Sequence, residues 1–513
     1  MLQLFRRFYQ QISQRTYLLL WLVVGLLGLI TLYIRIKVIF LVNPDVGGIE
    51  SNVIFSVLRM MAGYPLYQNP EQAPYAITQY SPIYYYLTAG LSRLLGFTSD
   101  DVYEVYSAGR CIALFANGFY ALGFWKLARR IQFPASVAVL VAVLAFLLLP
   151  PQSYGRPDSL YNAFVIWTIW ALVRWNASIT TKQLTTGLAL TALLAALGLF
   201  SKQSAICLPI IVSGYLLFFS GKPWKTFQFL GFFLLFLAVL YVSFFREAPS
   251  LIYANVIRGV SNGIDFVNFR YNLVDHYLRP FAWLVIPGVA ISIRYLLFEK
   301  GPRQLLGLAA FGLFLFALVT GLKWGSALNY FTEFTGLSCL LVADALWQLR
   351  TIRSDWANVG RLSLVMIVAL VLPVNAMNFN WERVIHKAID LTPYKEEQAV
   401  AQYVTREIKK YPGCLIYSTQ YNSSYLNAFL FRNCIVPQQD MIVGSAYELR
   451  TFDYTDLDRA AQDGRIQFLI ARDGETEAPL SPPIRLANYH PVKSLNGYTI
   501  YKFNTPSAQL SAK

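Results

Sequence analysis

Residues 226–245 read TFQFLGFFLLFLAVLYVSFF and contain no charged side chain. A segment of about 20 mostly apolar residues is long enough to cross the hydrocarbon core of a bilayer as an α-helix. Similar stretches recur along much of the chain and predict a polytopic membrane protein. We expect spans at 17–40, 105–125, 134–150, 159–175, 185–200, 204–220, 226–245, 281–298, 304–322, 331–348 and 361–378.

The composition indicates that much of the protein surface faces lipid. Hydrophobic residues make up 56% of the chain and charged residues 14%, whereas a soluble domain carries about a quarter charged residues. The formal net charge of +15 would also suit a nucleic-acid-binding protein. However, no basic patch interleaved with aromatic residues stands outside the apolar segments, and basic residues of membrane proteins collect in cytoplasmic loops. We therefore expect no nucleic-acid partner.

Two segments affect the number of spans. The apolar run from Tyr17 to Ile34 is too long for a signal peptide and lacks a small-residue cleavage site, so it predicts a retained first span. Residues 82–97 contain Arg93 and follow Pro82, which leaves a twelfth span, a re-entrant segment or an interfacial helix open. The predicted fold is thus α-helical with about 11–13 transmembrane helices.

The distribution of basic residues predicts the orientation of these spans. With the N-terminus in the cytoplasm and eleven spans, every short inside loop is basic, and the short outside turns carry one basic residue each. Arg35 and Lys37, near the outer end of the first span, are the mismatch, and they could snorkel or point into a polar cavity. The inside residues are Lys126, Arg129, Arg130, Arg174, Lys182, Lys222, Lys225, Lys300, Arg303, Arg350, Arg353 and Arg361; the outside ones are Arg156, Lys202 and Lys323.

An odd span count places the C-terminal tail outside the cell. We predict a transmembrane domain over 1–378, with long exterior loops at 43–104 and 246–280, followed by a soluble exterior domain over 379–513. The tail alternates predicted helices with short apolar strands, which is typical of a small α/β domain. Its predicted helices cover 394–411 and 457–463, and its predicted strands cover 414–418, 466–471 and 498–503.

An acidic motif, NPDVGGIE at residues 43–50, follows the first span. A charged side chain close to the membrane is costly, so Asp45 is a candidate catalytic residue and Glu50 a candidate substrate ligand. The alternative is that Asp45 or Ser51 caps a helix that begins near Ile49. From spacing alone, both interpretations stay open.

Aromatic and charged motifs follow at other span ends. Tyr67, Tyr80 and Tyr84 are candidate sugar-binding residues, although an interfacial aromatic belt explains each one equally well. Asp158 could instead cap a helix with Arg156 as its partner. The remaining candidates are Lys202, with a snorkelling lysine as the alternative, Tyr330, and Glu333, which would be costly if it faced lipid.

In the charge-derived topology, all of these motifs lie on the outer side of the membrane. Cations suit a phosphate, aromatic rings suit sugar faces, and access from the bilayer suits a polyprenyl tail. The motifs together predict an outward-facing cavity for an anionic ligand that is partly apolar and partly sugar-like.

These motifs resemble those of the GT-C superfamily of membrane glycosyltransferases, and most closely the family 39 branch that contains protein mannosyltransferases and aminoarabinose lipid A transferases. Asp45 matches the family's acid after the first span, but Val46 stands where relatives often have Glu. Tyr80-Ser81 stands where many relatives place a lysine before proline. The further matches, all over residues 15–350, are Gly63 to Tyr67, Tyr80 to Tyr86, Arg156-Pro157-Asp158, Leu197 to Lys202, and Asn329 to Glu333.

The resemblance implies inverting transfer of a sugar from a polyprenyl-phosphate donor to a lipid, glycan or protein acceptor at the outer face of the cytoplasmic membrane. Asp45 would be the general base. Lys202 and Arg156 would stabilise the leaving lipid phosphate, with Asp158 holding Arg156 or touching the acceptor. Glu333 and Tyr330 would line the sugar pocket, and the 246–280 loop, with Arg258 and His276, would close over the substrate.

The sequence supports no metal site, because no histidine pair or tight carboxylate cluster appears beyond Asp45 with Glu50. We expect no required cofactor, although a divalent metal stays open. Cys414 and Cys434 could form a disulfide outside the cell or remain thiols. The main alternative function is a transporter or flippase for a lipid-linked saccharide, but the chain shows no internal repeat of the kind that transporters usually carry.

Overall fold

The computed structural model describes residues 22–23, 25–150, 153–176, 181–245, 247–349, 390–419, 424–436, 441–473 and 484–504. By their contacts, the residues fall into two compact units. We call the first the helical unit, which lies within Met1–Val38, Ala113–Phe244 and Ile264–Lys387, and the second the mixed unit, which lies within Ile39–Ile112, Phe245–Gly263 and Ala388–Lys513.

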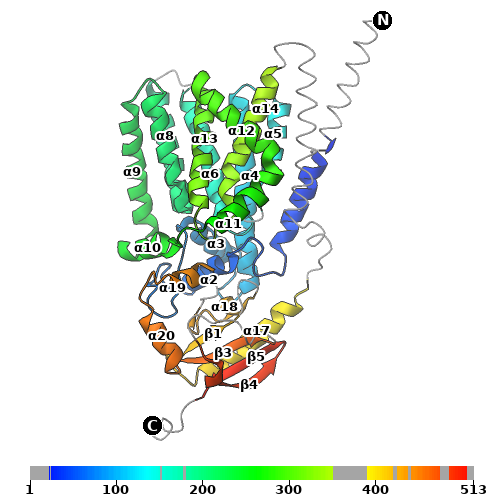
Figure 1. Ribbon diagram of the computed structural model, residues 1–513, viewed down its shortest axis with the longest axis vertical. Helices are drawn as coiled ribbons and strands as arrows, with labels where there is room; N and C mark the ends of the chain where they lie inside the picture. The colour runs from blue at the N-terminus through cyan, green and yellow to red at the C-terminus, as the bar shows by residue number, and fades with distance from the viewer. Residues whose placement is uncertain are drawn as a thin grey trace. The chain divides into compact units, whose positions relative to one another are not determined.

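The helical unit consists of apolar helices, several of which run side by side (Figure 1). Residues 25–39 are helical, and the long helix α4 contributes its part from Ala113 onward. A short α11 and a π-helical turn, η4, lead into α12. The elements are α4 (Val102–Arg130), α5 (Ala135–Leu147), α6 (Asp158–Asn176), α7 (Thr181–Ser201), η2 (Gln203–Ile206), α8 (Cys207–Phe218), α9 (Lys225–Phe244), α11 (Phe266–Arg270), η4 (Tyr271–Leu278), α12 (Arg279–Phe298), α13 (Pro302–Gly321), η5 (Leu328–Phe331) and α14 (Thr332–Leu349).

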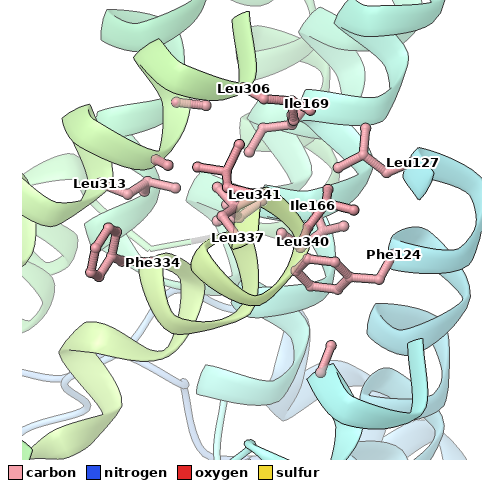
Figure 2. Close-up of a cluster of buried hydrophobic side chains, with 14 of the residues drawn as sticks. Phe124, Leu127, Ile166, Ile169, Leu306, Leu313, Phe334, Leu337, Leu340 and Leu341 are labelled. Atoms are coloured by element: carbon pink, nitrogen blue, oxygen red, sulfur yellow. The ribbon is translucent and has the colours of Figure 1, made fainter. Parts of the chain in front are cut away.

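The core of the helical unit is built almost entirely from aliphatic and aromatic side chains. Figure 2 shows Leu337, Leu340 and Leu341 of α14 among side chains from α4, α6 and α13. Small residues bring some of these helices into direct backbone contact. A Cβ at Gly307 of α13 would lie 2.6 Å from the Ser292 carbonyl oxygen of α12, which is the close approach that small residues permit between membrane helices.

Ten of the predicted spans coincide with helices, and the span predicted at 361–378 lies outside the described residues. By length and hydropathy, four described helical segments are sufficient to cross a membrane: Val102–Arg130, Lys225–Phe244, Phe266–Phe298 and Pro302–Gly321. Three further helical segments are apolar but shorter: Ala135–Leu147, Thr185–Ser201 and Gln203–Phe218. The observed architecture is thus the predicted helical one.

Arg35, which the charge pattern leaves as a mismatch, is buried inside the helical unit. Its guanidinium donates to the carbonyl oxygens of Phe146 and Leu149, at 3.4 and 3.3 Å, where α5 ends. It also lies 4.6 Å from the ring centroid of Tyr154. A cation that donates to the last carbonyl groups of a helix stabilises that helix end. Arg35 therefore neither snorkels nor stands in an open polar cavity.

The mixed unit contains short helices and one five-stranded sheet with the order β2-β1-β3-β5-β4. The first three strands are parallel, and β5 and β4 are antiparallel to their neighbours. The helices are α2 (Glu50–Met61), α3 (Ile83–Leu94), α10 (Pro249–Val256), η3 (Arg258–Val260), α17 (Thr392–Ile408), α18 (Leu426–Phe429), α19 (Met441–Glu448), α20 (Thr455–Gln462) and η6 (Leu486–Asn488); the strands are β1 (Leu415–Ser418), β2 (Ile435–Val436), β3 (Ile466–Arg472), β4 (Tyr489–Leu495) and β5 (Tyr498–Phe503).

The small α/β domain predicted for the tail is therefore present, and the first long loop is built into its core. Tyr75 and Ile77 of that loop pack with Leu415 and Leu469 of the sheet, and the Tyr75 hydroxyl donates to Asp456 at 2.5 Å. The predicted domain boundary at 378/379 lies outside the described residues. The second long loop is divided, because Phe245–Gly263 belongs to the mixed unit and the residues from Ile264 onward belong to the helical unit.

The open question about residues 82–97 is settled by helix length. The helix there, α3, has 12 residues, and at 1.5 Å per residue it is about 18 Å long. This is well short of the roughly 30 Å of hydrocarbon that a spanning helix must cross. Residues 82–97 are therefore not a full crossing.

Candidate functional site

Asp45 holds the start of α2. Its carboxylate accepts hydrogen bonds from the backbone N–H groups of Ile49 and Glu50, at 3.0 and 3.2 Å. Ile49 itself has a left-handed backbone with φ 65°, which turns the chain into the helix. The capping interpretation of Asp45 thus describes its contacts. It leaves a catalytic role open, because each carboxylate oxygen has a second lone pair and the side chain is only half-buried.

Arg110 of α4 ties this loop down, and the sequence analysis missed it. Its guanidinium forms a buried ion pair with Glu50, at 2.7 Å from Nε to Oε1. It also donates to the carbonyl oxygens of Leu41 and Asn43, at 2.7 and 2.5 Å. A charge inside a predicted span is a functional candidate by default, and Arg110 within the predicted span 105–125 carried that signal.

Glu50 is completely buried, and its carboxylate stabilises the loop through hydrogen bonds and an ion pair. Besides the pair with Arg110, its Oε2 accepts a hydrogen bond from the backbone N–H of Val46 at 3.0 Å. These contacts make Glu50 a structural partner of the loop that carries Asp45. We name the segment 41–50 the Asp45 loop.

The three candidate tyrosines are buried in the mixed unit. The Tyr67 hydroxyl donates to the Tyr80 carbonyl oxygen at 2.8 Å, and the Tyr84 hydroxyl donates to the Gly109 carbonyl oxygen at 2.8 Å. Their observed contacts therefore hold backbone segments together. The two loop residues are exposed and lie in different units: Arg258 lies over the Phe452 ring in the mixed unit, and His276 meets the Tyr271 ring in the helical unit.

The helical unit brings together a second group of candidates around Asp158. Lys202 Nζ lies 2.7 Å from Asp158 Oδ1, and Arg156 Nε lies 3.2 Å from Oδ2. The Asn329 amide donates to Oδ1 at 2.6 Å. All four side chains are buried. Residues more than 170 positions apart thus converge on one carboxylate, which we name the Asp158 cluster.

Aromatic and acidic groups border the Asp158 cluster. Lys202 Nζ lies 5.0 Å from the ring centroid of Tyr330 and 5.7 Å from that of Tyr161, within the range of cation–π attraction. Glu333 is buried in the first turn of α14, and its carboxylate accepts a hydrogen bond from the Asn162 amide. The structure therefore brings five predicted site residues together: Arg156, Asp158, Lys202, Tyr330 and Glu333.

A third cation adds positive charge to this region. Lys323 lies in the turn after α13, and burial together with the charge of Lys202 lowers the pKa of Lys323 to about 8. Three cations thus accompany the carboxyl groups of Asp158 and Glu333. An excess of buried or half-buried positive charge favours an anion.

The remaining predictions concern metals and cysteines. Across the described ranges, no group of three or more His, Cys, Asp or Glu side chains is arranged to hold a metal ion. Cys414 and Cys434 are not joined in a disulfide in the structure. Neither the Asp45 loop nor the Asp158 cluster therefore depends on a disulfide between them.

Comparison with known proteins gives matches in structure but not in sequence. No protein-family model and no curated protein matches the sequence. The structure of ArnT from Cupriavidus metallidurans, bound to undecaprenyl phosphate, matches with a TM-score of 0.59 at 13% identity, over 94% of this chain and 98% of ArnT. The oligosaccharyltransferase AglB from Archaeoglobus fulgidus, in complex with an inhibitory peptide and a dolichol-phosphate, matches with a TM-score of 0.55 at 12% identity, over 88% of this chain and 69% of AglB.

The ArnT match extends over almost the whole of both chains and includes the region after the apolar helices. In this chain, apolar helices are followed by a small α/β domain. The chain therefore shares its overall fold with ArnT and AglB.

Proposed function

We propose that this protein is an inverting glycosyltransferase that moves a sugar from a polyprenyl-phosphate donor to an acceptor at the outer face of the cytoplasmic membrane. The observation that carries the proposal is the Asp158 cluster, in which buried cations are held together within a GT-C fold. The presence of undecaprenyl phosphate in ArnT and of dolichol-phosphate in AglB supports a lipid phosphate as the anion.

In this mechanism Asp45 is the general base. The acceptor hydroxyl or amine attacks the anomeric carbon, Asp45 takes its proton, and the bond from that carbon to the phosphate oxygen breaks. Two backbone N–H groups hold the carboxylate in one orientation, which suits a base that must meet its proton in a defined geometry. Arg110 and Glu50 keep the rest of the Asp45 loop in place.

The leaving group is the polyprenyl phosphate, whose negative charge grows as the bond breaks. Lys202 and Arg156 stabilise this charge, and Asp158 holds both cations in position before the donor arrives. Fixed charges of this kind need no reorganisation during the reaction. Tyr330 and Glu333 line the pocket for the transferred hexose or pentose.

The test is a transfer assay with purified protein in lipid nanodiscs and polyprenyl-phosphate sugars. We expect Asp45→Asn to fold, because an asparagine oxygen still accepts a backbone hydrogen bond, and to lose transfer by at least about a hundredfold. The matched control is Asp453→Asn, since Asp453 also accepts a backbone hydrogen bond at the start of a helix in the mixed unit. Normal transfer by Asp45→Asn would remove Asp45 from the mechanism.

A further inference from the structure

Two buried tyrosine hydroxyls next to the Asp45 loop have no hydrogen-bond partner among the residues that the structure describes. Tyr106 of α4 is 0% exposed, and Tyr425, immediately before α18, is 3% exposed. Neither hydroxyl oxygen has a partner within the described part of the chain. A buried polar group left without a partner costs about 1–3 kcal/mol, so native proteins seldom keep one without a reason.

These tyrosines connect directly to the residues that hold Asp45. The Arg110 guanidinium lies 5.6 Å from the centroid of the Tyr106 ring. The Tyr106 ring meets the Tyr425 ring edge-on, with centroids 5.2 Å apart. Tyr106 also lies within electrostatic reach of Asp45 and Glu50. The two rings therefore stand beside the buried ion pair that anchors the Asp45 loop.

The C-terminal α/β domain fixes the position of Tyr425 from several directions. The Glu397 carboxylate of α17 accepts hydrogen bonds from the Tyr425 backbone N–H at 2.6 Å, from the Ser424 hydroxyl at 3.0 Å and from the Tyr498 hydroxyl at 2.8 Å. The ring of Tyr394 packs edge-on against Tyr425, with centroids 5.1 Å apart. The backbone and ring of Tyr425 are thus tightly held, while its hydroxyl is left to meet another group.

Two other buried tyrosines of the mixed unit serve as comparisons for these hydroxyls. Tyr489 is buried, and its hydroxyl donates to the Ile466 carbonyl oxygen at 2.9 Å. Tyr454 is buried with no hydroxyl partner among the described residues, but it packs in the core of the sheet with Phe452. Position beside the Asp45 loop therefore distinguishes Tyr106 and Tyr425 from Tyr454.

We propose that the hydroxyls of Tyr106 and Tyr425 bind the acceptor beside Asp45, so that the C-terminal α/β domain forms one side of the acceptor site. This inference rests on the proposed function, in which Asp45 takes the acceptor's proton. A phenol hydroxyl both donates and accepts hydrogen bonds, and a pair of them suits a ligand with neighbouring hydroxyl groups. In this proposal the acceptor is a saccharide, such as a glycolipid headgroup, whose neighbouring hydroxyl groups meet the hydroxyls of both tyrosines.

The test uses variants that remove one oxygen atom each, Tyr106→Phe and Tyr425→Phe, in the full-length protein. The acceptor probe is the glycolipid fraction of the host membrane, titrated in the transfer assay. We expect either variant to raise the half-saturating acceptor concentration about tenfold, which is the loss of one hydrogen bond of about 1.4 kcal/mol, with the KM for the donor unchanged. Because neither hydroxyl has a partner among the described residues, we expect the unfolding temperature to stay or rise.

Two control variants calibrate this experiment. Tyr454→Phe removes from the sheet core a hydroxyl that has no partner in the described ranges, so it should raise the unfolding temperature and leave acceptor use unchanged. Tyr489→Phe removes a hydroxyl that has a partner, so it should lower the unfolding temperature, again without an effect on acceptor use. Together they separate an effect on folding from an effect on the acceptor.

Three results would overturn the inference. Unchanged acceptor saturation in both variants would show that the hydroxyls do not meet the acceptor. A lowered unfolding temperature would show that each hydroxyl already has a partner, such as a buried water. Activity with a non-glycosylated acceptor only would exclude a saccharide. By contrast, a wild-type protein that transfers no sugar at all would refute the proposed function itself.

Discussion

At Asp45 a single carboxylate caps a helix and, in the proposed mechanism, serves as the general base. The two roles are compatible because the backbone N–H groups that it caps also orient it. Spacing could not decide between them, since the same residue type is preferred at a helix start and at a catalytic site. The structure also identifies Arg110. Its buried ion pair with Glu50 compensates the negative charge of the Asp45 loop where the loop contacts α4.

Removing Arg110 should destabilise the protein strongly. Arg110→Met leaves the Glu50 carboxyl group fully buried and without its cation. Breaking one side of a buried ion pair costs about 3–5 kcal/mol, so we expect a clear fall in the unfolding temperature measured in detergent. The control is Arg432→Met, which breaks a pair with Asp100 at the surface and should cost about 1 kcal/mol or less. Equal unfolding temperatures for the two variants would contradict this account.

Lys323 should make stability depend on pH. Its pKa is about 8 in the folded protein, against 10.5 for an ordinary lysine, so between these values the unfolded chain binds more protons. The folded state therefore gains stability as the pH rises from 8 to 10.5. We expect Lys323→Met to raise the unfolding temperature at pH 7, where the wild-type lysine is charged, and the gain to shrink towards pH 10. A gain that does not change with pH would mean that packing, not charge, is responsible.

At the scale of elements, helix positions could be predicted well from hydropathy, because long apolar runs have few alternatives in a membrane protein. The helices at 225–244 and 302–321 lie within a few residues of the predicted spans. Elements without a strong apolar pattern were harder to find. Strand β2 has only two residues, too few to form a recognisable pattern, and β4 exposes most of its side chains, so it lacks the apolar run of a buried strand.

Contacts between distant elements could not be predicted from the sequence. The approach of Asn329 to Asp158 and that of Tyr425 to Tyr106 each depend on how separate segments fold together. Arg156 and Asp158, by contrast, are near neighbours, and their pairing was foreseen as one alternative. Local spacing in the sequence therefore identifies candidate site residues, whereas only the structure shows which distant residues they contact.

A polar network joins three helices of the helical unit. The buried carboxylate of Asp344 on α14 accepts two hydrogen bonds. Arg303 Nε of α13 donates at 2.7 Å, and the hydroxyl of Tyr295 on α12 donates at 2.8 Å. We expect Asp344→Ala to lower the free energy of unfolding by about 3–5 kcal/mol, because it removes the charged acceptor that these donors share. Glu299→Ala, which breaks a long contact to the exposed Arg294, is the control. A loss no larger than the control's would show that the network does not hold these helices.

At the scale of the whole molecule, the chain combines a helical unit that holds the Asp158 cluster with a mixed unit that holds the Asp45 loop. In the proposed reaction, the helical unit supplies the cations that stabilise the lipid phosphate. The mixed unit supplies the base, Asp45, and the Arg110–Glu50 pair that anchors its loop. A transporter of lipid-linked saccharides could use the cations, but it would have no need for a base.

The most direct test of the central claim follows the donor's sugar–phosphate bond. Purified protein is reconstituted into liposomes with a polyprenyl-phosphate sugar and host glycolipids, and products are analysed by mass spectrometry and NMR. We predict free polyprenyl phosphate in equal amount to a glycosylated product whose anomeric configuration is inverted, and neither product with Asp45→Asn. Intact donor that changes leaflet without cleavage of this bond would contradict the account.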